Sequence, residues 1–125
     1  MSKIIGIIAG EPNSISSEII FKSWKLKKNF SHKKFIIIGS INLLKLQMKK
    51  LNFKIKLNEI NSSINLNNIK KDSINVLNVG YNQKKAFQKI STASNKYIKK
   101  CFDIALELIR KKKILGIINC PVAKE

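Results

Sequence analysis

The chain has 125 residues, of which 44% are hydrophobic, enough for one modest domain with a buried core. No apolar run is long enough to cross a bilayer, which argues against a membrane protein. The two cysteines have neither a close spacing nor a histidine neighbour, so free thiols in a reducing compartment are the simplest interpretation. The formal net charge of +18 comes almost entirely from lysines spread along the chain, with Arg110 as the only arginine. A lysine-rich surface produced by an AT-rich genome explains this charge better than specific nucleic-acid binding, which favours arginine.

The first predicted element is a strand over residues 3–9, a short isoleucine-rich run typical of a strand covered on both faces. A turn containing glycine and proline ends it. A helix follows to about residue 27, with Ser16 or Ser17 as its N-cap and Glu18 favourably placed in its first turn. Ligands bind at the carboxyl ends of strands in open α/β sheets, so this turn is a candidate site, although a plain strand-to-helix turn explains the same residues.

A second strand–helix–strand pattern occupies the middle of the chain. Residues 35–39 form a buried type of strand, and residues 41–51 carry apolar side chains at roughly helical spacing. Residues 53–57 alternate apolar and polar side chains, as a half-exposed strand does. The Asn-rich residues 58–72 are predicted to be a loop.

The last third of the chain begins with a predicted strand over residues 74–80. Residues 91–112 give the strongest helical pattern, with Ser91 or Thr92 as its cap and a final strand over residues 114–118 after it. The helix has one apolar stripe: Tyr97, Ile98, Cys101, Phe102, Ala105, Leu108 and Ile109. Strands that alternate with helices predict an α/β fold, in which Cys101 is a small buried residue.

Residues 10–18 read Gly-Glu-Pro-Asn-Ser-Ile-Ser-Ser-Glu. This segment resembles the N-terminal signature of the 4-hydroxythreonine-4-phosphate dehydrogenases, whose usual form is Gly-(Asp/Glu)-Pro-Ala-Gly-Ile-Gly-Pro-Glu. The matching residues are Gly10, Glu11, Pro12, Ile15 and Glu18. Ser14 and Ser16 stand where the family has glycines, and Ser17 stands where it has a proline.

Two further segments resemble the same family. Residues 89–93, Lys-Ile-Ser-Thr-Ala, are similar to a Lys-(Val/Ile)-Ser-Ala segment that opens a helix. Residues 119–125, Asn-Cys-Pro-Val-Ala-Lys-Glu, resemble the signature Thr-(Ala/Gly)-Pro-(Ile/Val)-x-Lys-Glu at a strand end. The resemblance runs in order from Ile4 to Glu125 and covers well under half of a full family member.

The resemblance implies a fold and an activity. The fold is an α/β/α sandwich similar to isocitrate and isopropylmalate dehydrogenase, with residues 1–125 as a single partial α/β domain, the N-terminal fragment of a larger two-domain enzyme. The activity is the NAD-dependent oxidative decarboxylation of 4-phosphooxy-L-threonine to 3-amino-2-oxopropyl phosphate in vitamin B6 synthesis. The family is a homodimer, and we expect a cytoplasmic protein with no specific nucleic-acid or membrane partner.

The resemblance also implies where ligands bind. The residues expected on the cofactor side are Glu11, Asn13, Ser14 and Ile15. Asn119 and Lys124 are expected on the substrate side, with Lys124 as a contact to phosphate or carboxylate. Each of these residues also fits a purely structural role, as a turn former or a solvated lysine. No catalytic residue is predicted within the chain.

The family's divalent metal, zinc, magnesium or cobalt, is held by histidines that lie beyond the last signature. The single histidine here, His32, lies in a polar link and cannot form a metal site alone. The ligands are therefore expected beyond Glu125, and the 125 residues by themselves are expected to be inactive.

Two other functions remain open at this point. One is a non-catalytic remnant of such an enzyme, and the other is a small basic nucleic-acid-binding protein. A fragment of a larger sheet is also expected to expose apolar surface and to self-associate.

Overall fold

The computed structural model describes residues 4–26, 34–61 and 68–119. Five strands form one parallel sheet in the order β3-β4-β2-β1-β5. The strands are β1 (Ile4–Ile8), β2 (Lys34–Gly39), β3 (Lys56–Ile60), β4 (Ser73–Asn78) and β5 (Gly116–Asn119). The helices are α1 (Ser16–Leu26), α2 (Ile41–Lys50), the short 3₁₀ helix η3 (Thr92–Ser94) and α3 (Asn95–Arg110).

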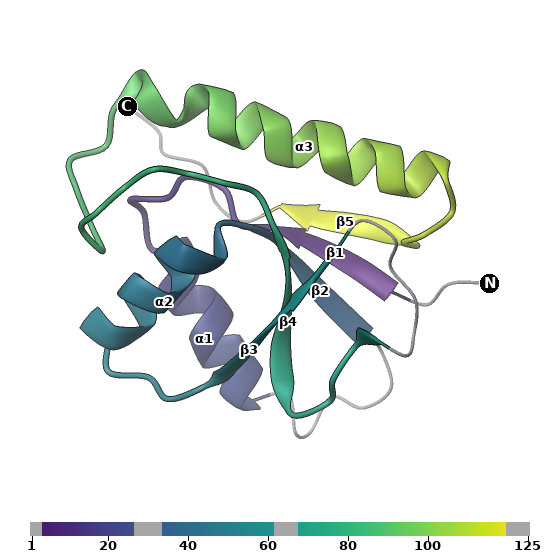
Figure 1. The fold of residues 1–125 in the computed structure, drawn as a ribbon, viewed down its shortest axis with the longest axis horizontal. Coiled ribbons are helices and arrows are strands. Elements are labelled where there is room, and N and C mark those ends of the chain that lie inside the picture. The colour runs from purple at the N-terminus through teal and green to yellow at the C-terminus, as the bar shows by residue number, and fades with distance from the viewer. Residues whose placement is uncertain (1–3, 27–33, 62–67, 120–125) are drawn as a thin grey trace.

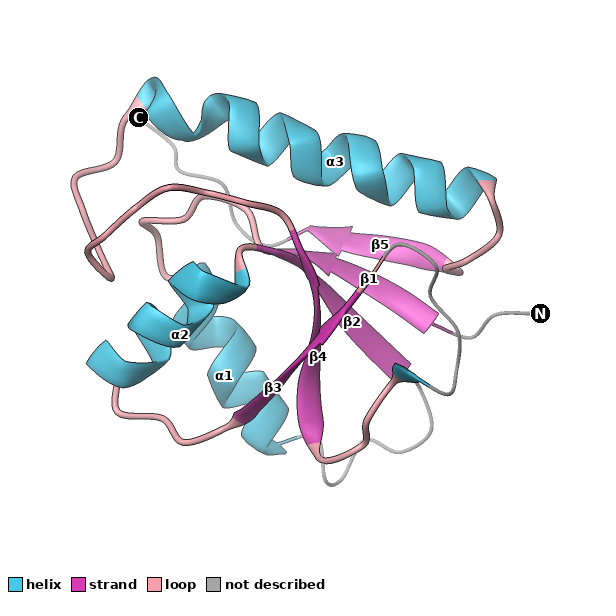
Figure 2. Cartoon of the chain, viewed as in Figure 1, coloured by secondary structure: helices cyan, strands magenta, loops and turns pink. Residues whose placement is uncertain are grey.

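Helices cover both faces of the sheet, which confirms the predicted α/β fold. Helices α1 and α2 lie on one face and α3 lies on the other (Figures 1 and 2). Side chains alternate along a strand, so Ile36 and Ile38 of β2 face α3 while Ile37 between them faces α1 and α2. The inner strands are therefore buried on both sides, which is why β1 and most of β2 are nearly continuous apolar runs.

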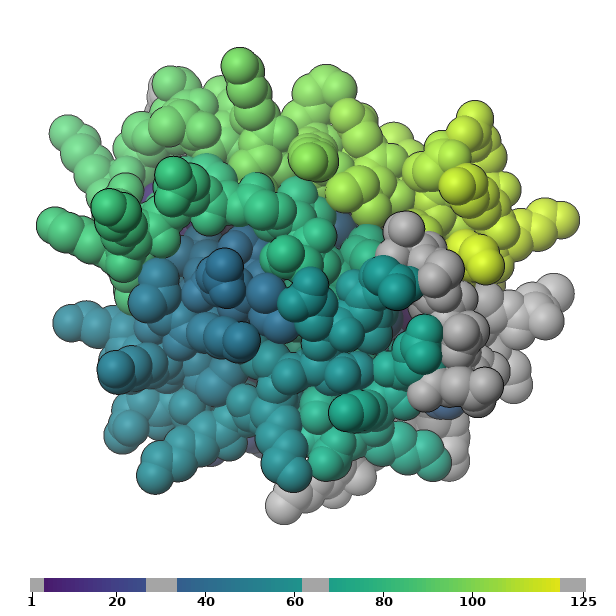
Figure 3. All heavy atoms as spheres, in the orientation of Figure 1, coloured from purple at the N-terminus to yellow at the C-terminus, as the bar shows by residue number. Residues whose placement is uncertain are grey.

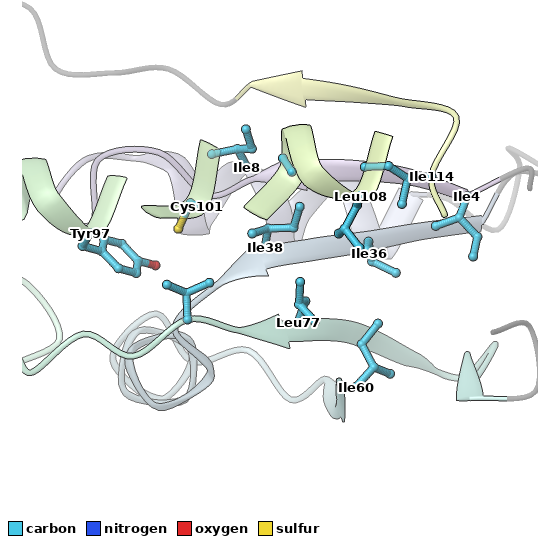
Figure 4. Packing of buried hydrophobic residues seen from close by; sticks show 12 residues of the cluster. Ile4, Ile8, Ile36, Ile38, Ile60, Leu77, Tyr97, Cys101, Leu108 and Ile114 are labelled. Carbon is cyan, nitrogen blue, oxygen red and sulfur yellow. The ribbon is translucent and has the colours of Figure 1, made fainter. Parts of the chain in front are cut away.

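The α3 side of the core contains the helix stripe predicted from the sequence. Ile8, Ile38 and Cys101 meet between the helix and the sheet (Figure 4). Of the predicted stripe, Tyr97, Cys101, Ala105 and Leu108 are buried, and Ile98, Phe102 and Ile109 pack partly buried against them. Burial raises the pKa of the Cys101 thiol to about 11, so the thiol stays protonated at neutral pH and serves packing.

The position of β3 differs from the prediction. The strand was expected at residues 53–57, but it begins at Lys56 and continues to Ile60. Phe53 instead packs against α1, where its ring centroid lies 5.5 Å from that of Phe21. Asn58, which was expected in a loop, lies in the strand and donates to Asn75 Oδ1 of β4 at 2.8 Å. Polar residues are tolerated there because β3 is an edge strand.

The opposite edge of the sheet is formed by β5. Within the described residues β5 pairs only with β1, and Leu115 and Ile118 on or beside it are exposed. Ile118 lies opposite Ile7 in the register, on the face that α1 covers further along the sheet. This edge therefore combines free backbone hydrogen-bonding groups with exposed apolar side chains, the combination that promotes pairing with another chain.

We therefore expect the 125-residue protein to self-associate through the β5 edge. The substitution Ile118→Lys should lower the fraction of oligomer in analytical ultracentrifugation, because a charge on an edge strand opposes strand pairing. Leu106→Lys changes a similarly exposed leucine on α3 and should leave the oligomer fraction unchanged. A wild-type protein that stays monomeric at high concentration would contradict the prediction.

Candidate functional site

The carboxyl ends of the strands gather at one edge of the sheet, because all five strands run parallel. The chain leaves β2 into α2 on one face and, after residues 79–91, reaches η3 and α3 on the other. A point where neighbouring strands send their connections to opposite faces is where doubly wound folds bind ligands. The loop after β4 runs across this edge between α2 and α3 (Figure 3).

Glu11 lies in the turn after β1, and its carboxylate is buried with only 4% of the residue exposed. Asn13 N–H donates to Oε1 at 3.2 Å, and the Ser94 hydroxyl of η3 donates to Oε2 at 3.0 Å. Glu11 makes no ion pair within the described part of the chain. Its charge is therefore stabilised by neutral donors, and it joins the turn to the start of α3.

Asn13 has its side chain engaged by the loop after β4. Its amide exchanges two hydrogen bonds with the Gln83 amide, at 3.2 and 2.8 Å, and its Oδ1 also accepts from Gln88 N–H at 2.9 Å. The two segments are 70 residues apart in the sequence. Asn13 thus acts as a link between the loops after β1 and β4.

The hydroxyl of Ser14 binds the first N–H group of α1, so neither of the predicted cap residues has this role. Ser14 Oγ accepts from Ser16 N–H at 3.2 Å and donates to the Glu11 carbonyl at 2.9 Å. Ser16 and Ser17, the predicted caps, lie inside the first turn of α1 and are buried. The prediction was wrong because α1 begins two residues before Glu18, so the capping hydroxyl has to come from further upstream.

Ile15 and Asn119 are the predicted site residues that face outward. Ile15 is 62% exposed, and Asn119 at the end of β5 is also exposed. Asn119 lies opposite Ile8 in the β1–β5 register, so it stands on the strand next to the Glu11 turn. The remaining predicted residue, Lys124, lies outside the described residues, as do His32 and Cys120.

Tyr81, Tyr97 and Gly39 pack closely at the carboxyl ends of β2 and β4. The rings of Tyr81 and Tyr97 lie 4.6 Å apart, and Tyr97 Oη accepts from Ser40 N–H at 2.8 Å. A Cβ on Gly39 would lie 2.9 Å from Ala9 Cβ and 3.0 Å from Tyr97 Oη, so only glycine fits there. Burial, and then the nearby charge of Glu11, raises the pKa of Tyr81, while burial raises that of Tyr97 well above its usual range.

Sequence reasoning missed three polar residues that hold this edge together: Gln47, Gln83 and Ser94. Gln47 lies on the buried face of α2, and its Nε2 donates to the carbonyls of Pro12 at 2.6 Å and Ala86 at 2.9 Å. An amide among apolar residues at helical spacing was the only available signal for Gln47, since Leu43 one turn earlier is buried on the same face.

A small cavity of about 10 Å³ lies beneath the Glu11 turn, which is room for one water molecule. Ser17, Gln47 and Tyr97 are among its lining residues. The Ser17 hydroxyl is buried and has no hydrogen-bond partner among the described residues. A single water in this cavity would satisfy it.

The described residues contain no group of three His, Cys, Asp or Glu side chains that could hold a metal ion. None of the described helices has the length and apolar character needed to cross a bilayer. At the carboxyl edge of the sheet, the described residues therefore provide a hydrogen-bonded polar turn and two exposed side chains, Ile15 and Asn119.

The Ser94–Glu11 hydrogen bond gives a direct prediction. Ser94→Ala should lower the free energy of unfolding by about 1–3 kcal/mol, because a buried carboxylate oxygen would lose its donor. Urea unfolding followed by circular dichroism measures this change. Thr92→Ala removes an exposed hydroxyl from the same turn and should change stability by less than about 0.5 kcal/mol. Equal effects of the two substitutions would contradict the prediction.

Comparisons with known proteins identify the family. Residues 31–125 match the family described as "Pyridoxal phosphate biosynthetic protein PdxA". A 4-hydroxythreonine-4-phosphate dehydrogenase from Burkholderia phymatum superposes with a TM-score of 0.82 at 20% identity, over 97% of this chain and 37% of that one. The enzyme of that name from Klebsiella pneumoniae gives 0.82 and 21%, over 99% of this chain and 38% of that one.

The chain thus spans less than two fifths of the length of these two structures, and the likeness to them shows a shared fold. A search of the curated proteins finds no match. The family match covers most of the chain, including β2 to β5 and the last signature segment. The chain therefore belongs to the PdxA family of pyridoxal phosphate biosynthetic proteins.

Proposed function

We propose that this chain forms the N-terminal part of an NAD-dependent dehydrogenase, a larger two-domain enzyme of pyridoxal phosphate synthesis. Its substrate would be 4-phosphooxy-L-threonine. Oxidation of its C3 hydroxyl would pass a hydride to NAD⁺ and release a proton, and the resulting β-keto acid would lose carbon dioxide to give 3-amino-2-oxopropyl phosphate. The observation that carries the proposal is the family match over residues 31–125.

The chain's own contribution would be one wall of the ligand cleft. Glu11, Asn13 and Ser14 use their side chains for hydrogen bonds within the protein, so they would act by fixing the shape of the turn. Ile15 is exposed and would provide an apolar contact to the cofactor, which supplies the hydride acceptor when it is bound. A wall that is already ordered loses little conformational entropy when a ligand binds.

The substrate side of the cleft would begin at β5, the strand next to β1 in the sheet. Asn119 places an exposed amide at the carboxyl end of β5, beside the Glu11 turn. An amide can donate to a phosphate or carboxylate oxygen, and Lys124 would add a positive charge five residues later. Both are proposed contacts to the phosphorylated hydroxy-amino acid.

The metal ion does not fit the described residues, which provide no cluster of three ligands. A zinc, magnesium or cobalt ion would need ligands from outside the described residues. We also propose a cytoplasmic homodimer, on the strength of the family resemblance. The exposed apolar edge at β5 supports association with further polypeptide, either another part of the same enzyme or a second copy.

The first experiment measures the intact mass of the protein from its source and its production of NADH. We expect NADH to form when 4-phosphooxy-L-threonine, NAD⁺ and a divalent cation are added to the purified protein. A mass above the 14.2 kDa of these residues would mean that further polypeptide takes part. No NADH from a protein of any mass would overturn the proposed activity, and a remnant without catalysis would then be the better description.

A second prediction concerns Ile15, which is the proposed apolar contact in the cofactor wall, that is, the turn formed by residues 11–15. Ile15→Asp should weaken NAD⁺ binding by about tenfold or more in isothermal titration calorimetry, because it replaces an apolar contact by a charge that has to be desolvated when the cofactor binds. Leu26→Asp is the matched control, since Leu26 is 63% exposed at the far end of α1, the helix that begins directly after Ile15. Equal NAD⁺ affinities for the two variants would contradict the role of Ile15.

A further inference from the structure

Gln47 occupies an unusual position for an amide side chain. It lies on α2 with only 2% of the residue exposed, among Leu43, Leu44 and Met48. Its Nε2 donates to the Pro12 carbonyl at 2.6 Å and to the Ala86 carbonyl at 2.9 Å. Carbonyl oxygens only accept hydrogen bonds, so this position calls for two N–H donors, and its burial favours a neutral group.

The two carbonyls belong to different loops of the site. Pro12 lies in the turn after β1, and Ala86 lies in the loop after β4. The loops also meet directly through the Asn13–Gln83 amide pair. Gln47 is different because it comes from beneath both loops and ties them to a helix.

Helix α2 is a firm base for this contact. Ser40 Oγ accepts from Leu43 N–H at 3.2 Å, and Asn78 Oδ1 at the end of β4 accepts from Ile41 N–H at 3.0 Å. Both of these hydrogen bonds fix the start of α2 against the carboxyl ends of β2 and β4. The position of Gln47 is therefore set by the sheet itself, independently of the two loops that it holds.

We propose that Gln47 is a positioning residue that holds the turn after β1 and the loop after β4 as one unit. It is too buried to touch a ligand, so it would act through Pro12 and Ala86. This inference rests on the proposed function for its consequence, because the turn it holds is the proposed cofactor wall. Loss of Gln47 would loosen both loops together and weaken cofactor binding.

The first test measures amide hydrogen exchange in the whole protein. Gln47→Met keeps the length and loses both donors, and Gln47→Glu places a carboxylate against two carbonyl oxygens. In both variants the amides of Ser14, Ser16 and Gln88 should exchange about tenfold faster or more. The Val79 amide directly follows β4 and donates to the Gly39 carbonyl at the end of β2, so it is held by the sheet and should exchange as in the wild type.

The control is Asn42→Asp, an amide-to-acid change at an exposed position of α2, which should leave loop exchange unchanged. Loop amides that exchange at the wild-type rate in both Gln47 variants would overturn the proposal. Equal acceleration of the loops and of Val79 would overturn it as well, because Gln47 would then only support global stability.

The second test measures NAD⁺ affinity of the same variants by calorimetry. We expect the dissociation constant to rise about tenfold in Gln47→Met and to stay at the wild-type value in Asn42→Asp. Unchanged affinity in a variant with loosened loops would overturn the positioning role. A wild-type protein that binds no NAD⁺ would overturn the proposed cofactor wall, while the exchange result would still decide whether Gln47 joins the loops.

Discussion

Burial of the central strands on both faces is the constraint on which the rest of this structure depends. Strands β1, β2 and β4 carry buried or partly buried apolar side chains on both faces, so helices have to cover both faces of the sheet. The chain meets this demand by crossing from the α2 side to the α3 side after β4. That crossing lays residues 79–91 over the carboxyl edge, where they reach Asn13 and Gln47.

The elements that sequence patterns located well are those specified by neighbouring residues. Isoleucine runs marked β1 and β2, and the apolar spacing from Tyr97 to Ile109 marked α3. The edge strand β3 was misplaced by three residues because one of its faces is solvated and its polarity resembles that of a loop. Edge strands take their position from partners such as Asn75, which no local window includes.

In the candidate site, too, features set by neighbouring residues were predicted, and features set by distant residues were missed. The Glu11 turn and Asn119 were placed correctly at strand ends, because a strand followed by a polar turn is a local pattern. Gln47, Gln83 and Ser94 were missed because their partners lie 35, 70 and 83 residues away. A buried polar residue acquires its role only when the topology supplies its partner, and a single sequence does not show that partner.

The serines of the signature segment show how this turn differs from a glycine-rich one. Gly10, with φ of 76°, is the only position of the described turn that needs a left-handed backbone. The glycines at positions 14 and 16 in the usual signature are therefore not required for the backbone shape. Ser14 and Ser16 instead bring their hydroxyls within 2.7 Å of each other.

The hydroxyls of Ser14 and Ser16 stabilise the turn, but the serine side chains also occupy space next to its backbone. Ser14 Oγ bonds both to the Glu11 carbonyl and to the start of α1, so the turn has few alternative conformations. The added side chains also keep a ligand from approaching the backbone as closely as glycine allows. A ligand bound at this edge, as proposed above, would therefore rely more on the exposed Ile15 side chain and less on backbone N–H groups than in a glycine-rich turn.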